Sequence, residues 1–255
     1  MNAGAVDRSR VAFLLHAGDN ALVLGQRLVA LVGHAPILEE ELGIANVALD
    51  LLGHARMWLT YAGEVEGTDR TEDDFAYFRG AGEFRNALLV EQPNGNFADT
   101  IVRQFLFDAW HARALGAWSA SDDERIAAIA QKAKREVDYH VTRSGDWVVR
   151  LGDGTEKSHA LAQTALDALW PYTGELFDSG DADRDLAARG IAVPPEALRD
   201  AWLGDVGDVL ARATLAVPES GWTPSGGKRG VHTEHLGYLL AEMQSLRRSV
   251  PGERW

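Results

Sequence analysis

The stretch NVALDLLGHARMW, Asn46–Trp58, decides the fold class of this 255-residue chain. Asn46, Asp50 and His54 are spaced four residues apart, so they lie on one stripe of a helix that is otherwise mostly apolar. A carboxylate and an imidazole on such a stripe are typical of a metal site inside a helical bundle. The same pair could be a polar contact between neighbouring helices. Both interpretations predict a helix that packs against other helices.

Three further long segments have the same helical character. We expect helices over residues 8–32, 37–64 and 97–120, and a fourth that starts from an N-cap at Ser121 and stops at the glycines of 152–154. The first two are joined tightly through GHAP, 33–36, and the last two are also joined tightly, which favours antiparallel hairpins. The link between the hairpins is longer, and residues 75–90 are expected to be irregular or a short helix.

The rest of the chain predicts helices over 156–177, 194–215 and 233–250, with a short helix after the loop DSGDADRD, 178–185. Strand patterns are weak throughout, because alternating runs of Val, Ile and Thr are missing. We therefore predict an all-α fold: a ferritin-like four-helix bundle with additional C-terminal helices. A single domain is expected over residues 1–255.

Composition narrows the classes of function. The formal net charge of −13 argues against nucleic acid or an anionic membrane as the main partner. No apolar run is long enough to predict a membrane span, and no secretory signal is recognisable at the start. The chain has no cysteine, which excludes disulfides and thiolate metal sites and fits a cytoplasmic location.

The polar stripes of the four long helices predict a di-metal carboxylate site or the remnant of one. Such bundles take a Glu from each of two helices and a Glu-x-x-His motif from each of the other two. The available side chains nearly suffice: Asp19, Asp50, Asp108 and Glu136, with His54, His111 and His140.

The spacing of these residues departs from the metal-binding pattern. Asp50–His54 and Glu136–His140 are four apart instead of three, and the position three after Asp50 is Gly53, which has no side chain. The one pair with the correct step, Asp108–His111, lies on a helix that normally supplies a single Glu. We therefore interpret the seven residues as vestigial metal-site positions, with no metal and no catalytic residue in this chain. The alternative is that this chain itself binds a di-metal centre and activates O2.

Several long motifs identify a family. The chain resembles the structural (PaaC) subunits of phenylacetyl-CoA epoxidase complexes, also described as ring-1,2-phenylacetyl-CoA monooxygenases, in the following segments: LGQRL, GHAP, ANVALDLLGHAR, LLVEQPNGNFADTIVRQF, DAWH, LGDGT, ELFD and GGKRGVHTEHLGYLLAEMQ. The resemblance extends from about Leu15 to Trp255. Two of the motifs, LVEQPNGNFADTI and GKRGVHTEHL, are long enough to make chance agreement improbable.

The resemblance implies a role in aerobic phenylacetate catabolism. The complex inserts one oxygen atom of O2 into the aromatic ring of phenylacetyl-CoA and forms a 1,2-epoxide. A ferritin-like catalytic subunit holds the di-iron centre, and an NADPH-dependent reductase delivers electrons. The family resembled here supports the catalytic subunit and lacks a working metal site. The partners implied are therefore these protein subunits and phenylacetyl-CoA.

The resemblance also places acyl-CoA contacts on two segments. One comprises Glu83, Phe84, Arg85 and Asn86, and the other comprises Arg184, Asp185 and Leu186. A third segment, GGKRG at 226–230, combines flexible glycines with Lys228 and Arg229, which suits phosphate groups. This segment could equally dock an acidic partner or be a solvated loop. A stand-alone acyl-CoA-binding protein is a third interpretation of the whole chain.

Overall fold

The computed structural model of the chain describes residues 6–219 and 221–250. Of these described residues, 73% are helical and none lies in a strand, which confirms the prediction of an all-α fold. Within them, no helix is both long and apolar enough to cross a bilayer. The ends of the predicted 1–255 domain fall outside the described residues, and the single domain stays a prediction.

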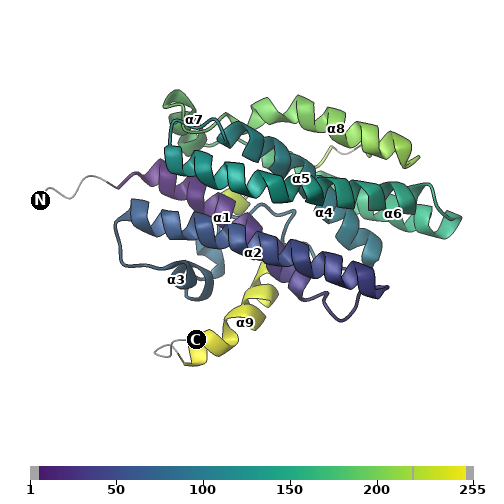
Figure 1. Ribbon diagram of the computed structural model, residues 1–255, viewed down its shortest axis with the longest axis horizontal. Coiled ribbons are helices and arrows are strands. Elements are labelled where there is room, and N and C mark those ends of the chain that lie inside the picture. Colours follow the sequence, from purple (N-terminus) through teal and green to yellow (C-terminus); the bar gives the residue numbers. More distant parts are fainter. Residues whose placement is uncertain (1–5, 220, 251–255) are drawn as a thin grey trace, which may run out of the picture.

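Four long helices pack side by side (Figure 1). Their bounds agree with the sequence-based expectation within a few residues: α1 (Arg8–Val29), α2 (Leu38–Glu66), α4 (Phe97–Trp118) and α5 (Glu124–Gly152). Helix α1 packs along α2 and α4 packs along α5, and α2 also contacts α5. These contacts between α2 and α5 bring most of the predicted polar stripes together.

Small residues let the first two helices approach closely. A Cβ atom built on Gly18 of α1 would lie 2.7 Å from Leu59 of α2, closer than a real Cβ contact allows. Large side chains fill the space between the hairpins, where Phe13 of α1 meets Trp118 of α4 edge to face at 4.8 Å between ring centroids. Gly18→Ala would therefore push the first hairpin apart.

The link between the hairpins is short on helix and deeply buried. It contains α3 (Glu72–Tyr77) and the one-turn 3₁₀ helix η1 (Ala81–Glu83), and then continues as irregular chain to the N-cap of α4. Residues 86–92 of this irregular part are buried without exception. Buried irregular backbone must find hydrogen-bond partners outside regular structure, and the partners come from the C-terminal third of the chain.

That third wraps around the four long helices. It contains α6 (Glu156–Leu169), η2 (Trp170–Phe177), α7 (Asp181–Ala188), η3 (Pro195–Leu198), α8 (Arg199–Arg212), η4 (Gly227–Arg229) and α9 (Glu234–Ser249). Helix α8 lies over α4 and α5, and the yellow α9 projects from the opposite side (Figure 1).

Two predicted boundaries are wrong. The helix expected over 156–177 ends at Leu169, because Pro171 cannot donate the next α-helical hydrogen bond and the chain tightens into η2. The N-cap of α5 is Asp123, whose carboxylate accepts from the backbone N–H groups of Arg125 and Ile126. Ser121 instead donates to the carbonyl of Ile191 at 2.6 Å and ties this corner to the segment after α7.

Candidate functional site

Four of the predicted metal-site residues form crossed pairs between α2 and α5. The Nε2 atom of His140 lies 3.0 Å from the Asp50 carboxylate, and the Nε2 atom of His54 lies 2.6 Å from that of Glu136. Because the helices are antiparallel, each four-residue step on one helix matches a four-residue step on the other. Each imidazole therefore binds the carboxylate of the other helix instead of sharing a metal with its own.

The crossed pairs lie at the edge of the interior. The two imidazoles are buried, whereas the side chains of Asp50 and Glu136 are 36% and 37% exposed. Burial lowers the pKa of His54, although its hydrogen bond to Glu136 raises it in part. Hydrated carboxylates holding buried imidazoles are stable without any further ligand.

Asp108 lies deeper, on α4, and is already hydrogen-bonded. Its carboxylate accepts from Gln104 at 2.7 Å and from Ser144 of α5 at 2.9 Å. Burial raises the pKa of Asp108 to about 6, and the charge of His140 and these two hydrogen bonds offset only part of that rise. Removal from water therefore disfavours the anionic form that a metal ligand needs.

His111, also on α4, contacts the cluster through its ring alone. Its ring centroid lies 5.9 Å from that of His54, and burial lowers the pKa of His111 well below the ordinary value. Within the described residues His111 makes no hydrogen bond, and the Nδ1 atoms of His54, His111 and His140 are all buried without a partner. These atoms leave polar groups inside the protein that nothing in the described chain satisfies.

Asp19, the seventh predicted position, lies in a different network. Its buried carboxylate forms an ion pair with Arg79, one arm of which spans 3.0 Å, and accepts from the backbone N–H of Arg85 at 2.8 Å. No contact joins Asp19 to the other six positions in the described chain. The guanidinium of Arg79 occupies the charge-balancing role that a metal would otherwise have there.

The residues present therefore do not fit a di-metal centre. Within the described residues, no three His, Asp or Glu side chains converge closely enough to hold a metal ion. The carboxylates that would be needed already bind His140, His54 or Arg79, or accept hydrogen bonds from neutral groups.

His111→Leu tests this interpretation of the bundle centre. We expect the variant to be unchanged or up to about 1 kcal/mol more stable, because it removes an unpaired buried polar group and leaves no partner behind. Urea unfolding followed by circular dichroism measures the difference. The control is His140→Leu, which leaves Asp50 without its partner and is expected to be less stable. A loss of more than about 2 kcal/mol in His111→Leu would contradict the prediction.

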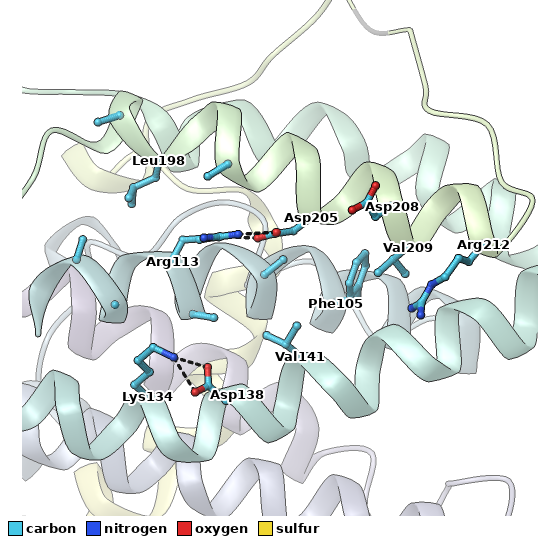
Figure 2. Close-up of a pocket in the computed structure, with 16 residues that line it drawn as sticks. Phe105, Arg113, Lys134, Asp138, Val141, Leu198, Asp205, Asp208, Val209 and Arg212 are labelled. Atoms are coloured by element: carbon cyan, nitrogen blue, oxygen red, sulfur yellow. Dashed lines mark hydrogen bonds and ion pairs between the residues drawn. The ribbon is translucent and has the colours of Figure 1, made fainter.

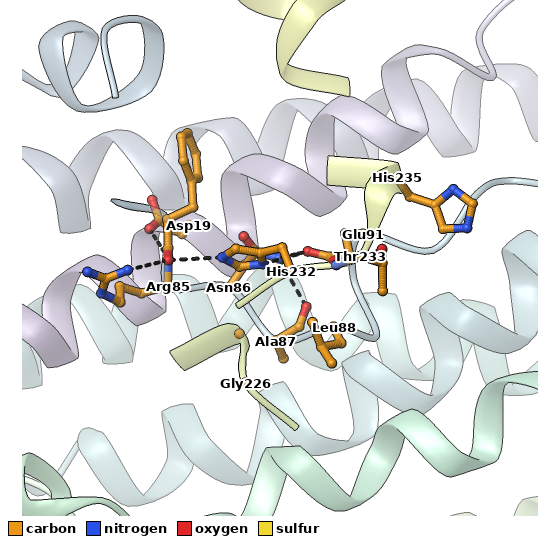
Figure 3. A network of polar contacts seen from close by, with 12 residues as sticks. Asp19, Arg85, Asn86, Ala87, Leu88, Glu91, Gly226, His232, Thr233 and His235 are labelled. Atoms are coloured by element: carbon orange, nitrogen blue, oxygen red, sulfur yellow. Dashed lines mark hydrogen bonds and ion pairs between the residues drawn. The ribbon is translucent and has the colours of Figure 1, made fainter. Parts of the chain in front are cut away.

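The buried link between the hairpins meets the loop before α9 at Glu91 (Figure 3). The Glu91 carboxylate accepts from Asn86 at 2.9 Å, from the backbone N–H of Thr233 at 2.6 Å and from its hydroxyl at 2.8 Å. His232 bridges the same two segments, with Nδ1 2.8 Å from Glu91 and Nε2 3.0 Å from the carbonyl of Phe84. Since both ring nitrogens face acceptors, His232 satisfies both only as the doubly protonated cation.

The stability of the protein should therefore depend on pH through His232. Burial alone would lower its pKa, but the hydrogen bonds to Glu91 and Phe84, with the charges of Glu91 and Glu175, raise it above the ordinary value. A raised folded-state pKa means that the stabilisation is complete below about pH 6.5 and is lost as the pH rises through the folded-state pKa.

We accordingly expect wild type to exceed His232→Gln in unfolding free energy most strongly below about pH 6.5, by about 1.5–3 kcal/mol for the charge-assisted bonds. The difference should shrink at higher pH. Urea unfolding of both proteins across the pH range gives the comparison. A difference that grows with pH would show that the neutral imidazole is the bound form.

Glu175 of η2 is the second buried carboxylate at this junction. It accepts from the backbone N–H groups of Gly226 and Gly227, both at 2.6 Å, and from that of Leu88 at 2.7 Å. The glycines of GGKRG thus already bind an anion, supplied by the chain itself. This contact removes the backbone donors from the phosphate interpretation of the loop and leaves only its two side-chain cations.

The first predicted acyl-CoA segment is mostly inside the protein. Phe84 and Asn86 are fully buried, and Asn86 hydrogen-bonds to Glu91. The backbone carbonyl of Arg85 accepts from the ring of His16 at 2.7 Å, and the Glu83 carboxylate accepts from the backbone of Gly80. This segment supports the neighbouring walls more than it offers exposed donors.

The second segment lies on α7 beside a cavity of about 380 Å³. Arg184 lines the cavity, whereas Leu186 is buried in the core and Asp185 pairs with Arg189. The other lining residues come from α1, η2, α7 and the loop before it, and η4: Ala12, Phe13, His16, Glu175, Asp178, Ser179, Gly180, Asp181, Ala182, Asp183, Lys228 and Arg229. The structure therefore brings one residue of the second segment together with both cations of GGKRG.

The charges of this cavity are unequal in their availability. Lys228 lies 3.6 Å from Asp183 and donates to the carbonyl of Asp178, and Arg184 pairs with Asp181. The exposed Arg229 forms no ion pair within the described residues. Burial, and then the charge of Lys228, lower the pKa of His16 to about 4, so that its imidazole is neutral at the cavity wall.

A larger groove of about 970 Å³ lies between α4, α5 and α8 (Figure 2). Arg113 crosses from α4 to Asp205 of α8 with two hydrogen bonds of 2.6 and 2.5 Å, and Lys134 pairs with Asp138. None of the predicted site residues lines this groove. Size alone is therefore a poor guide here, and the smaller cavity is the better candidate for substrate contact.

Sequence reasoning missed Arg79, Glu91 and Glu175, which organise the junction. Glu91 and Glu175 lie inside segments that the motifs quoted above already marked, VEQPNGN and ELFD. Their role could not be read from spacing, because each binds backbone or side chains more than 50 positions away in the chain.

Comparison with known proteins gives two agreements. The family model for phenylacetic acid catabolic proteins, a ferritin-like all-α family, matches residues 2–255. A protein of Escherichia coli (strain K12), whose name makes it the subunit of 1,2-phenylacetyl-CoA epoxidase that bears the letter C, is 50% identical over 244 residues. These residues cover 96% of this chain and 98% of that protein.

Proposed function

The chain belongs to the family of phenylacetic acid catabolic proteins, and from this we propose that it is a non-catalytic subunit of an epoxidase complex acting on phenylacetyl-CoA. The name of the Escherichia coli relative supports a place in an assembly of several subunits, since it designates one subunit of the epoxidase. The crossed binding of His54 and His140 to carboxylates of the opposite helix carries the non-catalytic part of the proposal.

In this proposal the oxygen chemistry belongs to a partner. A ferritin-like catalytic subunit would hold the di-iron centre, and an NADPH-dependent reductase would supply electrons. This chain, with its polar interior closed by hydrogen bonds and ion pairs, would act as a rigid support for the catalytic subunit. We place the complex in the cytoplasm, which the absence of cysteine favours.

Iron analysis of the separately purified subunits tests the assignment of the metal. We expect the iron to accompany the catalytic partner, and this chain to contain far less than one iron atom per molecule. About two iron atoms in the isolated chain would overturn the proposal and favour the alternative, in which this chain activates O2 itself.

We also propose that the cavity beside α7 contributes to binding the acyl-CoA. The unpaired guanidinium of Arg229, with Lys228 and Arg184 nearby, suits the phosphate groups of coenzyme A, and the neutral imidazole of His16 offers a polar contact inside. The phosphate interpretation of GGKRG is retained here for its side chains only.

Charge reversal at this cavity should weaken substrate binding. Calorimetric titration of the isolated chain with phenylacetyl-CoA is expected to show Arg229→Glu about tenfold weaker than wild type, the loss of roughly one charge-assisted contact. Arg212→Glu is the matched control, because Arg212 is also exposed, forms no ion pair in the described chain and lines the other groove. Absence of heat with wild type would remove this cavity from the substrate site.

A further inference from the structure

Helix α2 has a second apolar face that nothing in the described chain covers. Its inner face packs on α1, with buried residues such as Val47, Leu51 and Trp58. On the outer face, Leu38, Leu42 and Leu49 are 70%, 58% and 66% exposed. No other helix crosses in front of this face in Figure 1. Exposed leucines are ordinary when single, but several on one helix face mark an interaction surface.

The spacing of these residues identifies the kind of surface. Leu38, Leu42, Ala45, Leu49 and Leu52 are separated alternately by four and three residues, the seam of a heptad repeat. Such a seam receives the apolar side chains of one other helix by knobs-into-holes packing. We call these five residues the outer seam. The seam ends at Arg56, which occupies the next position and pairs with Glu72.

The charges beside the outer seam indicate its partner. Glu39 and Glu41 flank the first two leucines, and the half-exposed Asp50 and Glu136 lie along the side toward α5. The whole chain carries a net charge of −13. A second copy would bring acidic flanks and a large like charge together, whereas a helix with Lys or Arg beside its apolar positions would be attracted.

We infer that the outer seam of α2 binds a helix of a different subunit of the epoxidase complex, with basic residues flanking its own heptad-spaced apolar side chains. This inference rests on the proposed function, which supplies the complex, and adds the surface by which the chain joins it. The binding would cover the exposed leucines without disturbing the inner face of α2.

Binding measurements on the assembled subunits test the inference. Leu49→Glu is expected to weaken association of this chain with the other epoxidase subunits about 100-fold, because it puts a charge into the centre of an apolar seam. The matched control is Leu246→Glu on α9, whose leucine is 62% exposed, and it should leave association unchanged. Circular dichroism should show both variants folded as wild type, since neither side chain is buried.

The possible outcomes separate the inference from the proposed function. If wild type and Leu49→Glu associate equally well, the seam is not the interface, although the subunit role stands. If wild type associates with no other subunit, the proposed function itself fails. If the isolated chain forms a dimer in ultracentrifugation that Leu49→Glu dissociates, the occupant is a second copy and the inference is overturned. Glu39→Lys should weaken association at low salt and lose this effect at high salt.

Discussion

Arg79→Met is expected to lower the free energy of unfolding by about 3–5 kcal/mol, the cost of leaving a buried charge without its partner. Arg79 and Asp19 have side chains that are 3% and 0% exposed, and they join the buried link to α1. Arg79 also donates to the carbonyls of Phe75 and Glu83 and lies 4.2 Å from the ring centroid of Phe84. Methionine preserves most of the apolar stem, so the loss reports mainly on charge and hydrogen bonding.

Two further proteins make the Arg79 result specific. Arg113→Met breaks the exposed pair with Asp205 and should cost less than about 1 kcal/mol. The double variant Asp19→Asn with Arg79→Met removes both charges and keeps an oxygen that can accept from the backbone of Arg85, so it should recover more than half of the loss. Urea unfolding of the four proteins gives these values. A single variant as stable as wild type would mean that Asp19 is uncharged in the fold.

Glu175→Ala is expected to cost at least about 3 kcal/mol, because it leaves three buried backbone N–H groups without an acceptor. Two of these donors, Gly226 and Gly227, belong to η4 and the residue before it, and the third, Leu88, belongs to the buried link. Hydrogen exchange should therefore accelerate most at these three amides, as the loop before α9 separates from the link.

The control for Glu175 is Glu64→Ala, which removes an exposed partner of Arg125 and should change stability by less than about 1 kcal/mol. Formate added to Glu175→Ala should restore part of the lost stability, since a small carboxylate can occupy the emptied position between the three donors. Unchanged exchange at the amides of Leu88, Gly226 and Gly227 would contradict the assigned role of Glu175.

The sequence predicted the local structure well because the relevant signals are local. Apolar residues repeat at helical spacing through each long segment, and Gly and Pro interrupt them, so α1, α2, α4 and α5 were placed within a few residues. The two errors have local causes that were misweighed. Asp123 outcompetes Ser121 as a cap because its carboxylate reaches two N–H groups, and Pro171 ends α6 early.

The stripe NVALDLLGHARMW shows where prediction from sequence stops. The four-residue step between Asp50 and His54, with Gly53 at the third position, was enough to argue against a di-iron motif. Which groups the two side chains bind instead depends on the register of α2 against α5, and a register between helices is set by packing along their whole length. Asp19 shows the same limit, since its partner Arg79 is 60 positions away.

The sequence by itself determined the helices, the family and the broken spacing of the metal-binding pattern, because each of these is written in neighbouring residues. Only the tertiary structure decided that Asp50 and Glu136 bind histidines of the opposite helix, that Glu175 fills the glycine loop and that Arg229 faces a cavity. The physical reason is the burial of polar groups. Each must find a partner inside the fold, and distant segments supply that partner only after they have packed together.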